Sequence, residues 1–277
     1  MTCALILAAG LGTRLRPLTA ATPKALCPVG NVALLDRALA RVAGLGLAGP
    51  AAVAVNASYL AARVADHVQG RATVSVEQPG PLGTAGALGR LRHWVDGRGV
   101  LVGNADAYLA ADAPPGPDIA ALRDGWDGRS VRLLVRPAAA GRPGEFGPWR
   151  FAGFSLLPWH RVRDLPDAPA ELWREVWRPA EAAGELECVP YPGAYRDCGT
   201  PRDYLAANLH AAARAGGTLV AADARVTGDV RDCVVGAGAA VAGTVRRAVV
   251  WPGARVADGE WLTEAIRLPD GRTVPAS

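Results

Sequence analysis

Apolar and polar positions divide the first 157 residues into short, mainly apolar runs that alternate with longer stretches of helical spacing. The helical stretches lie at 32–45, 58–68 and 84–95, with Ser58 as a candidate N-cap. The apolar runs predict strands at 3–9, 51–55, 72–76, 100–103, 131–135 and 149–157. This alternation favours an α/β fold, with a Rossmann-like, mostly parallel sheet wrapped by helices.

The pattern changes at about Gly216 to short runs of Val, Ala and Gly without a helical period. Residues 234–243 recur fifteen residues later as 249–258, with six of ten positions identical. Such a repeat predicts coils of a β-helix. We therefore expect a main domain over residues 1–215 and a short β-helix with its tail over 216–277. Two or three coils cannot bury their faces alone, so the tail should pack on the main domain or on another subunit.

Composition excludes several classes of protein. The net charge is +4, but the arginines are scattered and no basic and aromatic residues interleave, which argues against nucleic-acid binding. Five cysteines without C-x-x-C spacing indicate reduced thiols in the cytoplasm rather than disulfides or a zinc site. The apolar N-terminal run lacks a basic leader and is too short for a signal peptide or a membrane span. We expect a cytoplasmic protein without a membrane segment.

Lysine occurs once, at Lys24, among 30 basic residues. A lysine is a compact point charge and an arginine is a planar fork, so the two differ wherever a small anion must be met in a tight space. The surroundings of Lys24 make chance survival of this lysine the weaker explanation. It lies fourteen residues after Gly10, in a segment that follows the first apolar run.

A glycine-rich turn after a buried strand is suited to cradling phosphate with backbone N–H groups. The dinucleotide fingerprint is excluded, because Leu15 stands where its third glycine is required and the second strand ends in Asn56 instead of an acidic residue. The Walker loop is excluded because Lys24 comes too late in the chain. A third kind of nucleotide loop is required.

At these residues the chain resembles the sugar-1-phosphate nucleotidylyltransferases. The resemblance covers residues 1 to about 210, and the tail is similar to the left-handed hexapeptide-repeat β-helix of some members. Its motifs are Leu7-Ala8-Ala9-Gly10-Leu11-Gly12-Thr13-Arg14-Leu15-Arg16-Pro17-Leu18-Thr19, Thr22-Pro23-Lys24, Leu82-Gly83-Thr84-Ala85-Gly86-Ala87-Leu88, Gly103-Asn104-Ala105-Asp106, and Asp197-Cys198-Gly199-Thr200-Pro201.

The resemblance implies that a sugar 1-phosphate attacks the α-phosphorus of a nucleoside triphosphate and releases pyrophosphate. Catalysis would then consist mainly of neutralising charge and aligning the two anions. Arg14 and Lys24 would contact the phosphates, and Mg²⁺ would bind Asp106 and Asp197, whose alternative role is that of turn aspartates. The implied nucleotide-binding residues are Ala8, Ala9, Gly10, Gly12, Thr13, Gln78, Gly83 and Thr84.

The sugar side matches the family less well, since the second lysine of many relatives is absent and the segment between Arg136 and Arg150 is short. The 82–88 loop looks most like that of the mannose-1-phosphate guanylyltransferases, and this resemblance implies GTP and a mannose 1-phosphate or a similar sugar or cyclitol phosphate. The short segment instead resembles compact uridylyltransferases acting on cell-wall sugars. A thymidylyltransferase and a non-catalytic regulatory homologue are further alternatives. We expect a homo-oligomer, a dimer or tetramer, and sugar contacts from Asn104, Gly147, Gly153, Arg142 and Arg150.

Overall fold

The computed structural model describes residues 1–276 and separates into two compact units. The first unit consists of residues 1–11 and 35–195, and the second begins with residues 12–34 and resumes at residue 196. The chain therefore passes between the units three times. The first passage lies inside the predicted phosphate loop, between Leu11 and Gly12.

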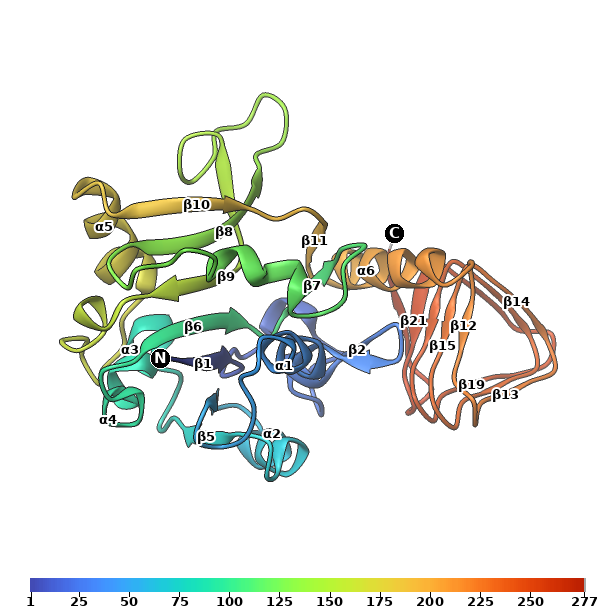
Figure 1. Ribbon diagram of the computed structural model, residues 1–277. Helices are drawn as coiled ribbons and strands as arrows, with labels where there is room; N and C mark the ends of the chain where they lie inside the picture. The colour runs from blue at the N-terminus through green and yellow to red at the C-terminus, as the bar shows by residue number, and fades with distance from the viewer. Residues whose placement is uncertain (277) are drawn as a thin grey trace. The chain divides into compact units, whose positions relative to one another are not determined.

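The first unit is built on a seven-stranded, mostly parallel sheet (Figure 1) with the strand order β10-β8-β9-β6-β1-β4-β5. Only β9 runs antiparallel to its neighbours β6 and β8. The strands are β1 Thr2–Leu7, β4 Val53–Ala57, β5 Thr73–Val76, β6 Gly99–Asn104, β8 Val131–Pro137, β9 Trp149–Leu157 and β10 Leu186–Pro190. The predicted parallel α/β arrangement is confirmed in this unit.

The helices of the first unit differ from the prediction mainly at their ends. They are α1 Leu34–Gly44, α2 Ala61–Val68, α3 Gly83–Arg90, α4 Arg92–Val95 and α5 Arg178–Ala182. The predicted N-cap at Ser58 is wrong, because Leu60 adopts a left-handed conformation and the helix begins after it. The stretch 84–95 forms two helices, because the backbone of Leu91 leaves the helical region.

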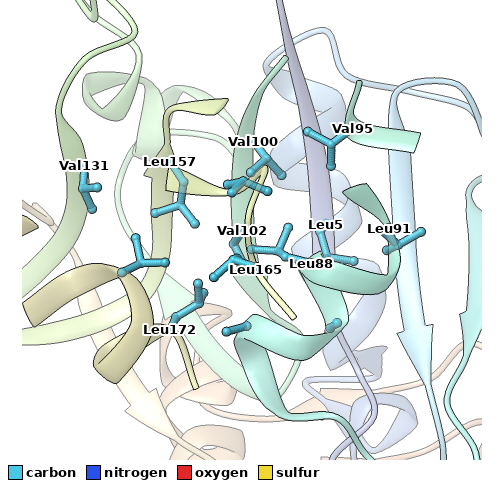
Figure 2. Packing of buried hydrophobic residues seen from close by; sticks show 14 of the residues in the cluster. Leu5, Leu88, Leu91, Val95, Val100, Val102, Val131, Leu157, Leu165 and Leu172 are labelled. Atoms are coloured by element: carbon cyan, nitrogen blue, oxygen red, sulfur yellow. The ribbon is translucent and has the colours of Figure 1, made fainter. Parts of the chain in front are cut away.

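One hydrophobic cluster fixes the central strands of this unit (Figure 2). Leu5 of β1 and Val100 and Val102 of β6 are at most 2% exposed and pack with Leu88 of α3 and Leu157 of β9. Fully burying an aliphatic side chain of this size contributes about 1.5–3 kcal/mol. The cluster therefore holds β1 and β6 rigidly, and the candidate site residues follow directly after these two strands.

In the second unit, residues 12–34 pack against the long helix α6, Pro201–Arg214. They form two 3-10 turns, Thr13–Leu15 and Lys24–Leu26, and the hairpin of β2, Pro28–Val29, with β3, Val32–Ala33. The Oδ1 of Asn208 accepts the Gly30 amide at 2.9 Å. The hydroxyl of Tyr204 donates to the carbonyl of Pro28 and accepts from the indole Nε1 of Trp251 at 3.0 Å.

The tail contains three narrow parallel sheets (Figure 1), in which strands from successive coils pair with one another. The strand orders are β12-β15-β18-β21, β13-β16-β19 and β14-β17-β20. Val234 pairs with Val249, and Ala240 with Arg255, so the fifteen-residue repeat becomes the pairing register. The strands are β12 Leu219–Val220, β13 Arg225–Val226, β14 Asp229–Arg231, β15 Val234–Val235, β16 Ala240–Val241, β17 Thr244–Arg246, β18 Val249–Val250, β19 Arg255–Val256, β20 Trp261–Thr263 and β21 Ala265–Arg267.

This arrangement is compatible with a β-helix, but its coils do not follow the predicted hexapeptide period. Three six-residue sides would advance the register by about eighteen residues. The observed advance is fifteen residues from β14 to β17 and seventeen from β17 to β20. The corners at 227–228 and 232–233 contain only two residues each. A Cβ on Gly228 would lie 2.0 Å from the carbonyl oxygen of Gly243, so stacking of these corners requires glycine.

The last strand, β22 Thr273–Pro275, pairs antiparallel with β21. The coils pack on α6, as expected for a tail that cannot bury its faces alone. The predicted domain boundary at 215/216 falls between α6 and β12, inside the second unit, and stays a prediction. Within residues 1–276, no helix combines the length and the apolar character that a membrane crossing needs.

Candidate active site

Three of the predicted site residues lie together in the second unit. The Lys24 Nζ lies 3.5 Å from the Asp197 Oδ1, and the Arg14 Nη2 lies 3.9 Å from the Asp197 Oδ2. The side chain of Lys24 is only 8% exposed, whereas those of Asp197 and Arg14 are 51% and 71% exposed. The structure thus brings two cations and one carboxylate to a half-open position.

The turn before Arg14 has little room for any other sequence. Gly12 has a φ of +62°, and a Cβ there would lie 3.0 Å from the Cγ2 of Thr19 and 3.2 Å from the Cβ of Lys24. The hydroxyl of Thr19 donates to the Gly12 carbonyl at 2.8 Å, and Thr13 begins the 3-10 turn that carries Arg14. Glycine at position 12 therefore lets the loop close against Lys24.

Buried thiols line the protein side of this cluster. Cys198 follows Asp197 and is fully buried, as is Cys27. Desolvation by burial, followed by the proximity of Cys198, raises the pKa of the Cys27 thiol to about 12. All five cysteines are free thiols in this structure. The buried side chains of Cys27 and Cys198 act as apolar packing behind the charged groups.

In the first unit, predicted residues collect at the carboxyl edge of the sheet. Leu7 pairs with Asn104 and the Ala105 amide donates to the Leu7 carbonyl at 3.0 Å. Ala8 and Asp106 therefore follow neighbouring strand ends, where open α/β sheets bind ligands. The Ala8 amide donates to the Asn56 Oδ1 at 2.7 Å. Ala9 is buried, whereas a Cβ on Gly10 would meet nothing within 4 Å.

The predicted base loop is held by contacts with residues 170–172. Gly83 has a φ of +72°, and a Cβ there would lie 2.4 Å from the Ala170 carbonyl oxygen. The Thr84 hydroxyl donates to the Glu171 Oε2 at 2.7 Å and accepts the Leu172 amide at 2.8 Å, so its hydrogen bonds are made within the protein. Gln78 opens the same loop and is exposed.

The predicted sugar-side residues lie on and near the β8–β9 hairpin. Gly153 has a φ of +85° and sits where β9 bulges, beside the end of β6, with Gly103 paired to Phe154. Arg150 is bound to Glu145, its Nη2 lying 3.1 Å from the Oε1. The structure places Gly147 and Arg142 in the connection between β8 and β9, and both are exposed.

The candidate metal ligands do not form a preformed cage in the part of the chain that the structure describes. Among residues 1–276, no group of three or more His, Cys, Asp or Glu side chains is close enough to hold a metal ion. Mg²⁺ keeps several waters and usually takes only one or two carboxylates together with substrate phosphates. The half-exposed carboxylate of Asp197 fits that donor chemistry, and its contact with two cations leaves an oxygen face open to solvent.

Sequence reasoning missed three residues that organise the site. Asn56 and Glu77 are buried polar residues that support the strand ends, and Glu171 holds Thr84. The one available signal was Glu77, a charged residue directly after an apolar strand. Its partners depend on the strand order, which the sequence does not display.

Comparison with known proteins indicates which proteins this chain is similar to. Residues 3–116 match the nucleotidyl transferase family. The N-acetylmuramate alpha-1-phosphate uridylyltransferase of Caulobacter vibrioides is 28% identical over 239 residues, covering 76% of this chain and 96% of the relative. The mannose-1-phosphate guanylyltransferase of Mycobacterium tuberculosis is 26% identical over 232 residues, covering 73% of this chain and 62% of the relative.

A solved structure supports the fold. A Bacillus anthracis protein provisionally named a glucose-1-phosphate thymidylyltransferase, crystallised with sucrose, superposes with a TM-score of 0.63 at 18% identity, over 76% of this chain and 95% of that one. At this identity the likeness concerns the fold alone. Taken together, the nucleotidyl transferase match over residues 3–116 and the sequence relatives show that this chain is similar to the sugar-1-phosphate nucleotidylyltransferases.

Proposed function

We propose that this protein joins a nucleoside triphosphate to a sugar 1-phosphate and releases pyrophosphate. One observation carries the proposal, namely the convergence of Arg14, Lys24 and Asp197 in the second unit. The reaction brings two anions together, so it requires fixed positive charge more than covalent chemistry. The nucleotidyl transferase match over residues 3–116 and the names of the sequence relatives support the same reaction class.

The two cations are suited to different roles. An ion pair such as Arg14–Asp197, 3.9 Å apart and mostly exposed, contributes about 0–1 kcal/mol. Arg14 can therefore leave Asp197 at little cost and present its planar fork to triphosphate oxygens. Lys24 is nearly buried and cannot move far, so we assign it a fixed position against the phosphate that changes bonds.

We further propose Mg²⁺ as the cofactor, with Asp197 and Asp106 as its protein ligands. When bound, the ion would neutralise phosphate charge that one lysine and one arginine leave unbalanced. Gly10, Gly12 and Thr13 would supply backbone donors to the triphosphate, and the positive φ of Gly12 supports that role.

For the base, we propose recognition by Gln78, with close backbone approach at Gly83. The amide of Gln78 is exposed at the start of its loop and offers both donors and an acceptor. The Leu82–Leu88 segment favours GTP with a mannose 1-phosphate or a similar phosphate, which is our first choice of substrates. The guanylyltransferase relatives support this choice.

A uridylyltransferase is the second candidate, and a specific observation favours it. The chain spans 96% of the Caulobacter vibrioides uridylyltransferase but only 62–63% of several guanylyltransferases. The short connection between Arg136 and Arg150 is also typical of compact uridylyltransferases. In this case Arg150 or Arg142 would meet the sugar phosphate in place of the absent second lysine.

A substrate matrix tests these proposals. Pyrophosphate release is measured for ATP, GTP, CTP, UTP and dTTP against mannose, glucose and N-acetylmuramic acid 1-phosphates, with Mg²⁺ present. We expect turnover with one base and one sugar well above the others. Saturable binding of a nucleotide sugar without pyrophosphate release from any pair would instead identify a non-catalytic regulatory homologue.

Two structural proposals accompany the function. We propose that the coils of the tail wind left-handedly and that the protein forms a homo-oligomer, a dimer or tetramer. The resemblance of the tail to left-handed hexapeptide-repeat β-helices supports the first proposal, and the stacked parallel strands are compatible with such coils. A crystal structure would decide the handedness, and light scattering coupled to gel filtration would decide the oligomeric state.

A further inference from the structure

A buried chain of hydrogen bonds crosses the carboxyl edge of the first unit's sheet. The Ala8 amide donates to the Asn56 Oδ1 at 2.7 Å, and the Asn56 Nδ2 donates to the Glu77 Oε1 at 2.8 Å. The Leu82 amide donates to the Glu77 Oε2 at 2.7 Å. Asn56 is 3% exposed and Glu77 is 1% exposed, so water does not replace these bonds.

The direction of these bonds requires one carboxylate. Both ends of the chain are backbone N–H donors, at Ala8 and Leu82. Two amide side chains between two donors would leave one N–H facing another N–H. A carboxylate accepts on both of its oxygens, so it reverses the donor direction once and satisfies every group. Glu77 makes this reversal.

The chain connects two segments that our proposed function assigns to the nucleotide. Ala8 is the first residue after β1 and leads into the predicted triphosphate loop. Leu82 ends the predicted base loop and precedes Gly83. The two segments are 74 positions apart in sequence, and Asn56 and Glu77 join them across β4 and β5.

We propose that Glu77 is a positioning residue for the nucleotide, which sets the base loop relative to the start of the triphosphate loop. The proposal rests on the proposed function. Hydrophobic packing alone does not call for a carboxylate at this place, because a buried charge is costly unless hydrogen bonds compensate for it. The carboxylate instead fixes the spacing and orientation of two loops, which governs binding of a ligand that contacts both.

The first test is Glu77→Gln, which replaces one carboxylate oxygen with an amide N–H₂ and leaves the volume nearly constant. Its amide N–H₂ must face either the Asn56 amide or the Leu82 amide. We expect the KM for the nucleoside triphosphate to rise by about tenfold, the factor that corresponds to 1.4 kcal/mol. The KM for the sugar 1-phosphate should stay within about twofold, since no sugar contact is altered.

The second test is the exchanged pair Asn56→Asp with Glu77→Gln. Asp at 56 would accept from Ala8 and from the Gln amide, and the Gln oxygen would accept from Leu82. Every hydrogen bond is restored with the carboxylate moved to the other position. We expect this double variant to regain the wild-type KM for the triphosphate within about threefold, whereas Asn56→Asp alone places two carboxylates together and should be impaired.

Asp118→Asn is the matched control, a carboxylate-to-amide change in the same unit. Asp118 is 4% exposed and binds the Arg41 Nε at 2.9 Å and the Gly116 amide at 3.0 Å. This variant should lower the thermal midpoint but leave the KM for the triphosphate unchanged. A rise in KM that merely follows the fall in thermal midpoint in both variants would overturn the positioning role.

Hydrogen exchange separates this inference from the proposed function. The Ala8 and Leu82 amides should exchange faster in Glu77→Gln and return to the wild-type rate in the double variant, whether or not the protein is active. Binding of GTP and UTP by calorimetry replaces KM if wild-type turnover is absent. An unchanged triphosphate KM or Kd in Glu77→Gln, or a double variant that folds without restoring it, refutes the proposal. If Glu77→Gln does not fold, the triphosphate KM or Kd of the double variant tests the proposal. A double variant that also fails to fold would contradict the proposal.

Discussion

Replacing Lys24 separates catalysis from stability in this protein. Lys24→Met keeps the length and the apolar stem of the side chain but removes the charge that lies 3.5 Å from the Asp197 carboxylate. Lys24→Arg keeps the charge and adds a planar head to a side chain that is 8% exposed. Both variants leave the glycine turn and the hairpin of residues 28–33 in place.

The magnitudes predict a large effect on rate and a small one on folding. At 3.5 Å and an effective dielectric constant near 20, two unit charges attract by about 5 kcal/mol. Asp197 is half exposed, so screening leaves roughly 1 kcal/mol or less as folding stability. A fixed donor to a developing oxyanion is worth about 10²–10³ in kcat, or about 2.7–4 kcal/mol.

The assay is pyrophosphate release under saturating substrates, with thermal unfolding measured on the same samples. We expect kcat and kcat/KM to fall together by about 10²–10³ for Lys24→Met, with a smaller but clear fall for Lys24→Arg. Arg231→Met is the control, since it removes a charge whose side chain is 72% exposed in the same unit. Wild-type turnover in Lys24→Arg would show that the lysine is a compositional accident.

Four further predictions follow from the same structure. Asp106→Asn and Asp197→Asn should each lower kcat strongly without unfolding, and a chelator should abolish pyrophosphate release; turnover that survives the chelator removes the metal assignment. Gln78→Ala should change the order of the turnover rates with GTP, UTP and dTTP, since each lost hydrogen bond is worth about 0.5–1.5 kcal/mol. An equal loss of activity with all three nucleotides would place Gln78 outside the base pocket. Tyr204→Phe leaves a buried indole N–H without its acceptor and should lower the unfolding free energy by about 1–3 kcal/mol in urea titrations. Burial raises the pKa of Cys27 to about 12. Above pH 9 the thiol therefore ionises in the unfolded chain but not in the folded protein, and the free energy of unfolding should fall by up to about 1.4 kcal/mol per pH unit. Cys27→Ala should reduce this slope.

The sequence allowed prediction of those features that depend on backbone pattern. The parallel strands followed from apolar runs, and the pairing register of the tail followed from its repeat, because residues fifteen apart occupy the same place in successive coils. The ends of the helices were harder to predict from the sequence. Ser58 has the composition of an N-cap, but Leu60 takes the left-handed conformation that decides where the helix begins.

The site shows the same limit. Arg14, Lys24 and Asp197 come from separate motifs, and the structure brings their charged groups together, but their assignment to the phosphates and the metal stays a prediction. Glu77 was not found, because its role depends on the Asn56 side chain at the end of β4 and on the Leu82 backbone amide, and the sequence does not show that these groups lie beside it. Nothing local in the sequence distinguishes a carboxylate that joins two loops from one that ends a strand at the surface.

The division of the second unit between two distant stretches of chain has a consequence for biosynthesis. Residues 12–34 leave the ribosome early, yet their partners Tyr204 and Asn208 follow about 170 residues later. At roughly 5–20 residues per second this delay is on the order of ten seconds or more. During that time the segment carrying Arg14 and Lys24 has no native surface to fold on, whereas most of the first unit's sheet is already synthesised. The nascent protein should therefore acquire its charged cluster last, and a chain that stalls before α6 should carry a largely folded sheet without catalytic competence.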